Sequence, residues 1–165
     1  MRIHHPNREK AASKATKAVI IVLLLASAAL IALVLIGGWT QMAGAELLAI
    51  AYILVYVLMA FFVARWNRGV LPVASGLAVL FAVVAAVAAP AWFARDKEGF
   101  ENPALEPSIL GLLTVIIVAV QVLLVAFAMR GFQQQWNVEV EVSQEDADRY
   151  DRGDMSEGDL HAAGA

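Results

Sequence analysis

Three uncharged polar side chains lie deep inside apolar stretches of the chain, where they could hold a ligand or each other. Gln121 is near the middle of one stretch, Thr114 lies one heptad before it on the same helical face, and Ser27 is near the middle of another stretch. An amide in hydrocarbon needs a partner, and such bonds contribute about 0.6–2 kcal/mol in membranes. We therefore predict a clamp between helices, from Gln121 to Ser27 or to a backbone carbonyl. The alternative is a hydrogen bond to a quinone or to a lipid headgroup.

Two tyrosines and one carboxylate are the next candidates for a site. Tyr52 and Tyr56 lie one helical turn apart in a third apolar stretch, and we interpret them as packing residues. Glu46 directly precedes that stretch. We expect Glu46 to be solvated at the rim of the stretch, the alternative being a carboxylate that couples the transport of an ion or a drug.

The remaining titratable groups make a weak case for a metal site. His4 and His5 could ligate a metal ion, but they lie in a mobile basic segment with no third ligand nearby, and His161 lies in an acidic tail. A loop of four carboxylates could form a weak divalent-cation site or a contact surface for a basic partner, although a solvated loop is the favoured interpretation; they are Asp96, Glu98, Glu101 and Glu106. We predict no catalytic residue, no cofactor site and no metal site.

The strongest exclusion comes from the apolar stretches themselves. Residues 18–37, 47–64, 70–92 and 109–129 contain no Asp, Glu, Lys, Arg or His. Proton relays, ion-coupled carriers and voltage sensors need ionisable groups at depth, and haem b needs a histidine there. The chain also has no cysteine, which removes disulfides, thiolate catalysis and iron–sulfur ligation. We therefore do not expect an enzyme, and nothing in the sequence indicates a nucleic-acid partner.

The length of these stretches predicts the fold. Of the 165 residues 61% are hydrophobic and 16% are charged, against about a quarter charged in an ordinary soluble domain. Each stretch approaches or exceeds the roughly 20 residues that a helix needs to cross a hydrocarbon core of ~30 Å. The expected fold is an all-α membrane protein, a bundle of four transmembrane helices over residues 18–130, within a lipid bilayer.

The distribution of basic residues predicts the orientation. Five Lys and Arg precede the first span, two lie between the second and third spans and one follows the fourth, whereas the opposite side carries two. Cytoplasmic segments near span ends carry the excess of Lys and Arg. We therefore expect a multi-pass protein of the cell (plasma) membrane with both termini in the cytoplasm. A cleaved signal peptide is the alternative, since residues 43–45 read Ala-Gly-Ala, but the first apolar run exceeds the ~7–15 residues of such a peptide.

The tryptophans and the alanines of the third span suggest how the bundle packs. Trp39, Trp66, Trp92 and Trp136 each follow the end of a span, where an indole prefers the headgroup level, so all four are predicted interface anchors. Helices in lipid associate where small residues let backbones approach. The third span gathers small residues on one side, and the predicted helix-packing residues are Ala74, Ala78, Ala82 and Ala86, together with Ser27 and Gln121.

The two ends of the chain differ in charge. Residues 1–17 form a basic leader in which Asn7 is a candidate N-cap for a helix that continues into the first span. Residues 131–165 form an acidic tail with nine acids after Gly131, and we expect it to be largely disordered after residue 143. Apolar and polar residues alternate over 136–143. This pattern is typical of a half-buried strand, which would need a partner edge, but chance alternation in a flexible tail is the favoured interpretation.

Several segments together carry a family resemblance: HHPNREK at 4–10, SKATK at 13–17, RWNRGVLP at 65–72, PAWFARD at 90–96 and AMRGF at 128–132. Over roughly residues 4–140 the chain resembles small four-helix membrane proteins of high-GC actinobacteria. A few proteins of that kind accompany the cytochrome bcc–aa3 respiratory supercomplex. The resemblance transfers no catalytic motif, and the link to respiration is implied by class membership alone.

Three function classes follow. The leading expectation is a non-catalytic accessory or assembly subunit of a larger membrane complex, with other membrane subunits as partners, and the resemblance implies a complex of the respiratory chain. The alternative is a small carrier or channel for a neutral solute or lipid, whose cavity only Thr114, Gln121, Ser27 and Tyr56 could line with polar groups. An enzyme is the least favoured class.

Overall fold

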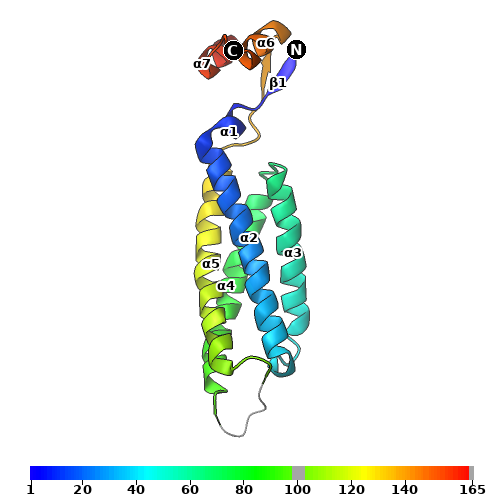
Figure 1. The fold of residues 1–165 in the computed structure, drawn as a ribbon, viewed down its shortest axis with the longest axis vertical. Coiled ribbons are helices and arrows are strands. Elements are labelled where there is room, and N and C mark those ends of the chain that lie inside the picture. The colour runs from blue at the N-terminus through cyan, green and yellow to red at the C-terminus, as the bar shows by residue number, and fades with distance from the viewer. Residues whose placement is uncertain (98–102, 164–165) are drawn as a thin grey trace.

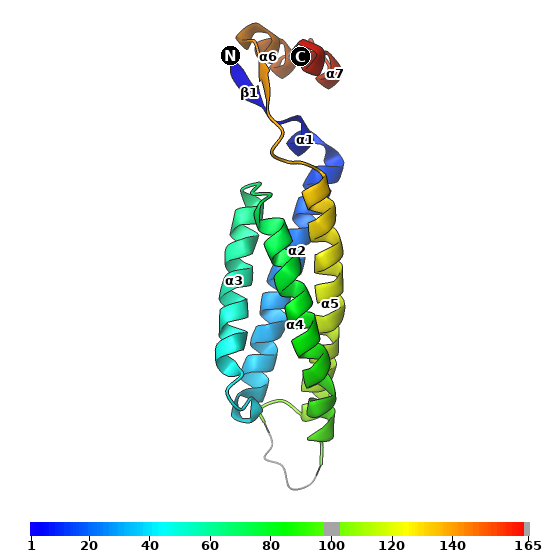
Figure 2. The same ribbon diagram turned by 180° about the vertical axis from the view of Figure 1, so that it is seen from behind.

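Four long helices form an antiparallel bundle, and a small second region sits on one end of it (Figures 1 and 2). The structure is a computed structural model that describes residues 1–97 and 103–163. The bundle helices are α2 (Ala11–Gly38), α3 (Glu46–Ala64), α4 (Val70–Ala94) and α5 (Pro107–Gln133). All four are long and apolar enough to cross a membrane, as the sequence predicted.

The bundle helices extend beyond the apolar stretches at most of their ends. Helix α2 begins seven residues before Ala18, because the Ala- and Lys-rich segment continues the helix outward. Asn7 is not its N-cap, which corrects the sequence prediction. Pro6 instead opens the short helix α1 (Pro6–Glu9), and the Asn7 side chain accepts a hydrogen bond from Lys10 Nζ (2.8 Å) and donates one to the Gln135 carbonyl (3.1 Å).

The helices do not contact one another equally. Helices α4 and α5 make the most extensive pair, and α2 packs on both α3 and α5. Helices α3 and α4 are joined by the short loop 65–69 and contact each other little. They diverge from that loop toward the opposite end of the bundle (Figure 2). The space between them is important for the site described below.

The buried face of α4 differs from the one predicted. Ala74 and Ala78 are fully buried, but Ala82 is half-buried and Ala86 is exposed. Residues four apart on a helix are 40° out of line, so a row of every fourth residue rotates away from a straight contact. The face that packs combines steps of three and four residues. Its buried residues are Leu71, Ala74, Ser75, Ala78, Phe81, Ala85, Ala89 and Trp92.

The two chain ends form a small region together. Strand β1 (Arg2–His4) pairs antiparallel with β2 (Val140–Val142), with Ile3 opposite Glu141. Helices α6 (Gln144–Asp151) and α7 (Glu157–Ala163) follow, and Figure 1 shows this region beyond the bundle end at which α2 begins and α5 ends. One further element, η1 (Trp39–Gln41), is a short 3₁₀ helix that follows α2.

Both predictions for the tail are therefore corrected. The alternation over 136–143 does contain a strand, because the N-terminal residues supply the partner edge that an isolated strand lacks. The segment after residue 143 is helical rather than disordered, because Ser143 caps α6 by accepting a hydrogen bond from the Asp146 amide (3.1 Å). Val142, Ala147 and Leu160 form a small apolar cluster beneath these elements.

Two of the four tryptophans are inside the protein. Trp136 is fully buried with its ring 5.2 Å from that of Trp66, and Trp92 is 5% exposed, whereas Trp39 is 53% exposed. The prediction that all four face the interface is not met by Trp92 and Trp136. Glycines create the room: a Cβ on Gly38 would come within 2.6 Å of the Trp92 ring, and one on Gly131 within 3.1 Å of Trp136.

Candidate functional site

A chain of hydrogen bonds joins three helices at the centre of the bundle. Tyr56 of α3 donates to Gln121 Oε1 of α5 (2.6 Å), and Gln121 Nε2 donates to Ser27 Oγ of α2 (3.0 Å). Ser27 donates in turn to the Leu23 carbonyl of its own helix (2.7 Å). All three side chains are fully buried. The structure thus contains the hydrogen bond expected between Gln121 and Ser27.

Tyr56 is the member of this network that sequence reasoning missed. Its position predicts a packing residue, or a lining residue in the carrier alternative, yet its hydroxyl donates to the amide oxygen of Gln121. The signal was available, because a phenol at mid-span also needs a hydrogen-bond partner. Since the three side chains bond to one another, they hold the helices together instead of lining a polar channel.

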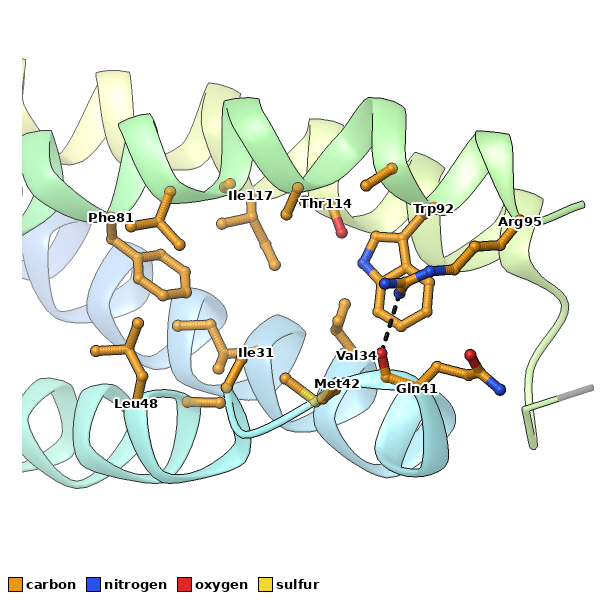
Figure 3. A pocket seen from close by; sticks show the side chains of 16 residues that line it. Ile31, Val34, Gln41, Met42, Leu48, Phe81, Trp92, Arg95, Thr114 and Ile117 are labelled. Atoms are coloured by element: carbon orange, nitrogen blue, oxygen red, sulfur yellow. Dashed lines mark hydrogen bonds between the residues drawn. The ribbon is translucent and has the colours of Figure 1, made fainter. Parts of the chain in front are cut away.

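A separate cavity of about 190 Å³ lies at the end of the bundle away from the termini (Figure 3). All four bundle helices contribute to its wall, which is mostly aliphatic. Figure 3 shows Phe81 at one end of the cavity and Trp92 with Arg95 at the other. The lining residues are Ile31, Val34, Gln41, Met42, Ala45, Leu48, Ala49, Phe81, Val84, Ala85, Ala88, Ala91, Trp92, Arg95, Thr114 and Ile117.

The cavity lies where α3 and α4 diverge, and small side chains on both helices leave the space between them unfilled. Alanines line it on both helices, for example Ala49 on α3 and Ala85 on α4. Leu48 and Val84, one on each helix, line it as well and are each 43% exposed. The cavity therefore opens sideways, between α3 and α4, on the outer surface of the bundle.

Aromatic contacts close the inner end of the cavity. The rings of Phe81 and Tyr52 lie 4.4 Å apart, and Tyr52 donates to the Leu77 carbonyl of α4 (3.3 Å). Tyr52 also makes an edge contact with Tyr56, at 5.5 Å between ring centroids. Tyr52 thus lies between Phe81 at the cavity and Tyr56 of the buried network.

A charged side chain, Arg95, lies at the outer end of the cavity. Arg95 follows the last residue of α4, and its Nη1 donates to the Gln41 carbonyl (3.0 Å) across the mouth. Its guanidinium carbon lies 5.0 Å from the centroid of the Trp92 ring. Thr114 also borders the cavity, but its hydroxyl donates to the Leu110 carbonyl of its own helix (2.7 Å). The site is thus an apolar chamber with a guanidinium at one end.

The histidines of the leader belong to the terminal region. His4 Nε2 lies 3.1 Å from Glu9 Oε1, and Tyr150 donates to Glu9 Oε2 (2.7 Å), a bond that raises the pKa of Tyr150 to about 12. His5 Nδ1 lies 3.4 Å from the Val138 carbonyl oxygen. The leader thus contains β1, α1 and the first residues of α2. Within residues 1–97 and 103–163, no three His, Asp or Glu residues are grouped to hold a metal ion.

The carboxylates of the sequence analysis are scattered. Glu46 is half-buried in the first turn of α3, and Asp96 and Glu106 are exposed. Glu98 and Glu101 lie outside the described residues, so the acidic loop cannot be assembled as a site, and the side chain of His161 also lies outside the described part.

Comparisons with protein-family models, with curated proteins and with solved structures give no match to this chain.

Proposed function

We propose that the chain is a multi-pass protein of the cell membrane that serves as a non-catalytic accessory or assembly subunit of a larger membrane complex. The surface of the bundle supports its place in a membrane. Large apolar side chains face outward on every long helix, among them Ile36 (69% exposed), Leu47 (78%) and Val87 (73%). Monomeric soluble proteins rarely expose contiguous apolar patches larger than a few hundred Å².

The buried Tyr56–Gln121–Ser27 network is the observation that carries the accessory role. A relay or a coupled carrier needs polar groups at depth that change partners during its cycle. Here the three polar side chains of the network are bonded to one another and connect α2, α3 and α5. Such a bundle is suited to act by its shape and its contacts. The resemblance to small actinobacterial proteins makes a respiratory complex the partner we propose.

Purification from native membranes tests the accessory role. We expect the tagged full-length chain, extracted in mild detergent, to retain membrane subunits in constant stoichiometry, and tagging one of those subunits to recover this chain in return. A monodisperse monomer with no co-purifying subunit would contradict the proposal.

The orientation can be tested separately because the chain has no cysteine. Thr40 and Gly153 are both exposed. Thr40 lies in η1 after α2, and Gly153 lies between α6 and α7, beyond the end at which α2 begins. With both termini in the cytoplasm, a membrane-impermeant maleimide should label Thr40→Cys in intact cells and should label Gly153→Cys only after the cells are opened. The reverse pattern would invert the proposed orientation.

The lateral cavity favours a second candidate function, the binding of a lipid for storage or transfer. Of the four residues expected to line a polar path, only Thr114 borders the cavity. The cavity therefore suits an apolar ligand better than a polar solute. Of the predicted carriers for a neutral solute or a lipid, we propose the lipid carrier.

A further inference from the structure

We propose that the lateral cavity holds one acyl chain of an anionic phospholipid, and that Arg95 binds its phosphate. This inference names the ligand class of the second candidate function and rests on it, whereas the accessory role is independent. Three properties of the cavity carry the argument: its size, its side opening and the position of its one lining guanidinium.

The size of the cavity selects an elongated ligand over a compact one. Pockets that enclose whole small molecules measure roughly 300–1,000 Å³. A cavity of about 190 Å³ holds only part of such a ligand. Its wall is mostly aliphatic, with the rings of Phe81 and Trp92 at its two ends, and the Thr114 hydroxyl donates to the Leu110 carbonyl of its own helix. A hydrocarbon chain fills such a space without leaving polar groups unpaired.

The opening matches the direction from which a lipid would arrive. The exposed side chains of Leu48 and Val84 stand on either side of it, on α3 and α4. In a bundle that crosses a membrane, this side of α3 and α4 faces hydrocarbon. An acyl chain can therefore enter between the helices while its headgroup stays at the end of the bundle.

Arg95 stands where that headgroup would lie. As the residue that follows α4, it is at the level where the apolar helix ends. Its guanidinium does not turn back to the carbonyls of α4 but reaches across the mouth to Gln41, a bond that uses one of five N–H donors. The ion pairs among the described residues do not include Arg95. A guanidinium with donors remaining matches phosphate oxygens in a two-bond geometry.

Native mass spectrometry of the purified full-length protein tests this proposal. The probes are phosphatidylglycerol and phosphatidylcholine of identical acyl chains, titrated into detergent micelles. Both carry a phosphate, but the choline cation cancels its charge in phosphatidylcholine, so only phosphatidylglycerol is a net anion. We expect one retained phosphatidylglycerol with about tenfold preference over phosphatidylcholine. Arg95→Gln should abolish the preference but keep chain binding, and Ala88→Leu, which fills the cavity, should abolish both.

Arg130→Gln is the matched control, because Arg130 is an exposed arginine at the end of α5 that does not line the cavity. It should bind both lipids like the parent protein. Ala91→Leu at the exposed rim gives a second cavity-filling variant, should Ala88→Leu fail to fold. Equal binding of the two lipids by the parent protein, or unchanged binding in Arg95→Gln, would overturn the proposal.

Retention of neither lipid would also overturn the proposal and would leave the cavity to a side chain of a partner subunit. Co-purifying subunits are scored in the same preparations. Loss of lipid with retained subunits refutes the lipid site alone, and loss of subunits with retained lipid refutes the accessory role alone.

Discussion

Gln121 and Glu9 each contact two partner side chains, and the burial of each group determines how much its contacts contribute to stability. Gln121 bonds Tyr56 and Ser27 where all three are fully buried, so no water can replace a lost partner. Glu9 contacts His4 and Tyr150 near the surface, with its side chain 41% exposed, so solvent screens those contacts. Replacing Gln121 should therefore lower the free energy of unfolding, whereas replacing Glu9 should mainly change the pKa of Tyr150.

Gln121→Leu should destabilise the bundle by about 1–2 kcal/mol, because it leaves the Tyr56 hydroxyl buried without its acceptor. Adding Tyr56→Phe should recover most of that loss, since both partners are then apolar. Unfolding in mixed detergent micelles, followed by circular dichroism, measures both variants. If the double variant is no more stable than Gln121→Leu alone, the network does not act as described.

Tyr150 should titrate near pH 12, because its neutral hydroxyl donates to the Glu9 carboxylate and ionisation would place two anions together. A pKa raised above its unfolded value of about 10 contributes stability that is complete below pH ~10 and is lost as the pH rises through about 12. Tyrosinate absorbance of the parent minus that of Tyr150→Phe isolates this group. Glu9→Gln should lower its pKa, and an unchanged curve in that variant would contradict the assignment.

At the scale of the element, α4 has two different sides along its alanines. Its packed side follows Ala74, Ala78 and Ala85, and most of its contact is with α5. Its other side carries exposed residues, including Ala86. Alanine is therefore a buried packing residue at Ala78 and an exposed residue at Ala86.

Ala78→Leu should destabilise the bundle by about 1–3 kcal/mol, because the added methylenes enter a fully packed contact. Ala86→Leu is the matched control and should change stability by no more than about 0.5 kcal/mol, since its side chain points outward. Both are measured by unfolding in mixed micelles. Equal losses in the two variants would show that the packed face of α4 is assigned incorrectly.

At the scale of the whole molecule, the two ends of the chain are joined on one end of the bundle. Besides the β1–β2 pair, Arg8 Nε donates to the Trp136 carbonyl (2.8 Å) and Arg68 Nε to the Phe132 carbonyl (2.7 Å). Lys17 Nζ lies 4.1 Å from the centroid of the Trp66 ring. These contacts join the leader, the α3–α4 loop and the start of the tail into one cap over the bundle.

The register of this cap can be tested with an engineered disulfide. Facing residues of antiparallel strands have Cα atoms about 4.5–5.5 Å apart, which is within the range a disulfide spans. Ile3→Cys with Glu141→Cys should therefore cross-link on mild oxidation, as seen by mass spectrometry. Ile3→Cys with Glu139→Cys, two residues out of register, should remain reduced. Comparable cross-linking of both pairs would indicate that the strands do not pair in this register.

The sequence alone determined the four helices and part of the buried network, for a local reason. A helix satisfies its backbone hydrogen bonds within the segment, so length and composition suffice to predict it. Gln121 and Ser27 could likewise be predicted to bond, because isolated polar groups in apolar spans have few alternatives. The hydrogen bond from Tyr56 to Gln121 was not predicted, because a tyrosine in an apolar span can also serve as a packing residue.

The tertiary structure alone decided which faces meet. The rotation of each helix about its axis sets whether Ala86 or Trp92 is covered, and the sequence pattern does not encode that angle when every face is apolar. The strand partner of residues 140–142 lies at the opposite end of the chain, so no local pattern could identify it. The lateral cavity has the same origin, since it is the space left where α3 and α4 diverge.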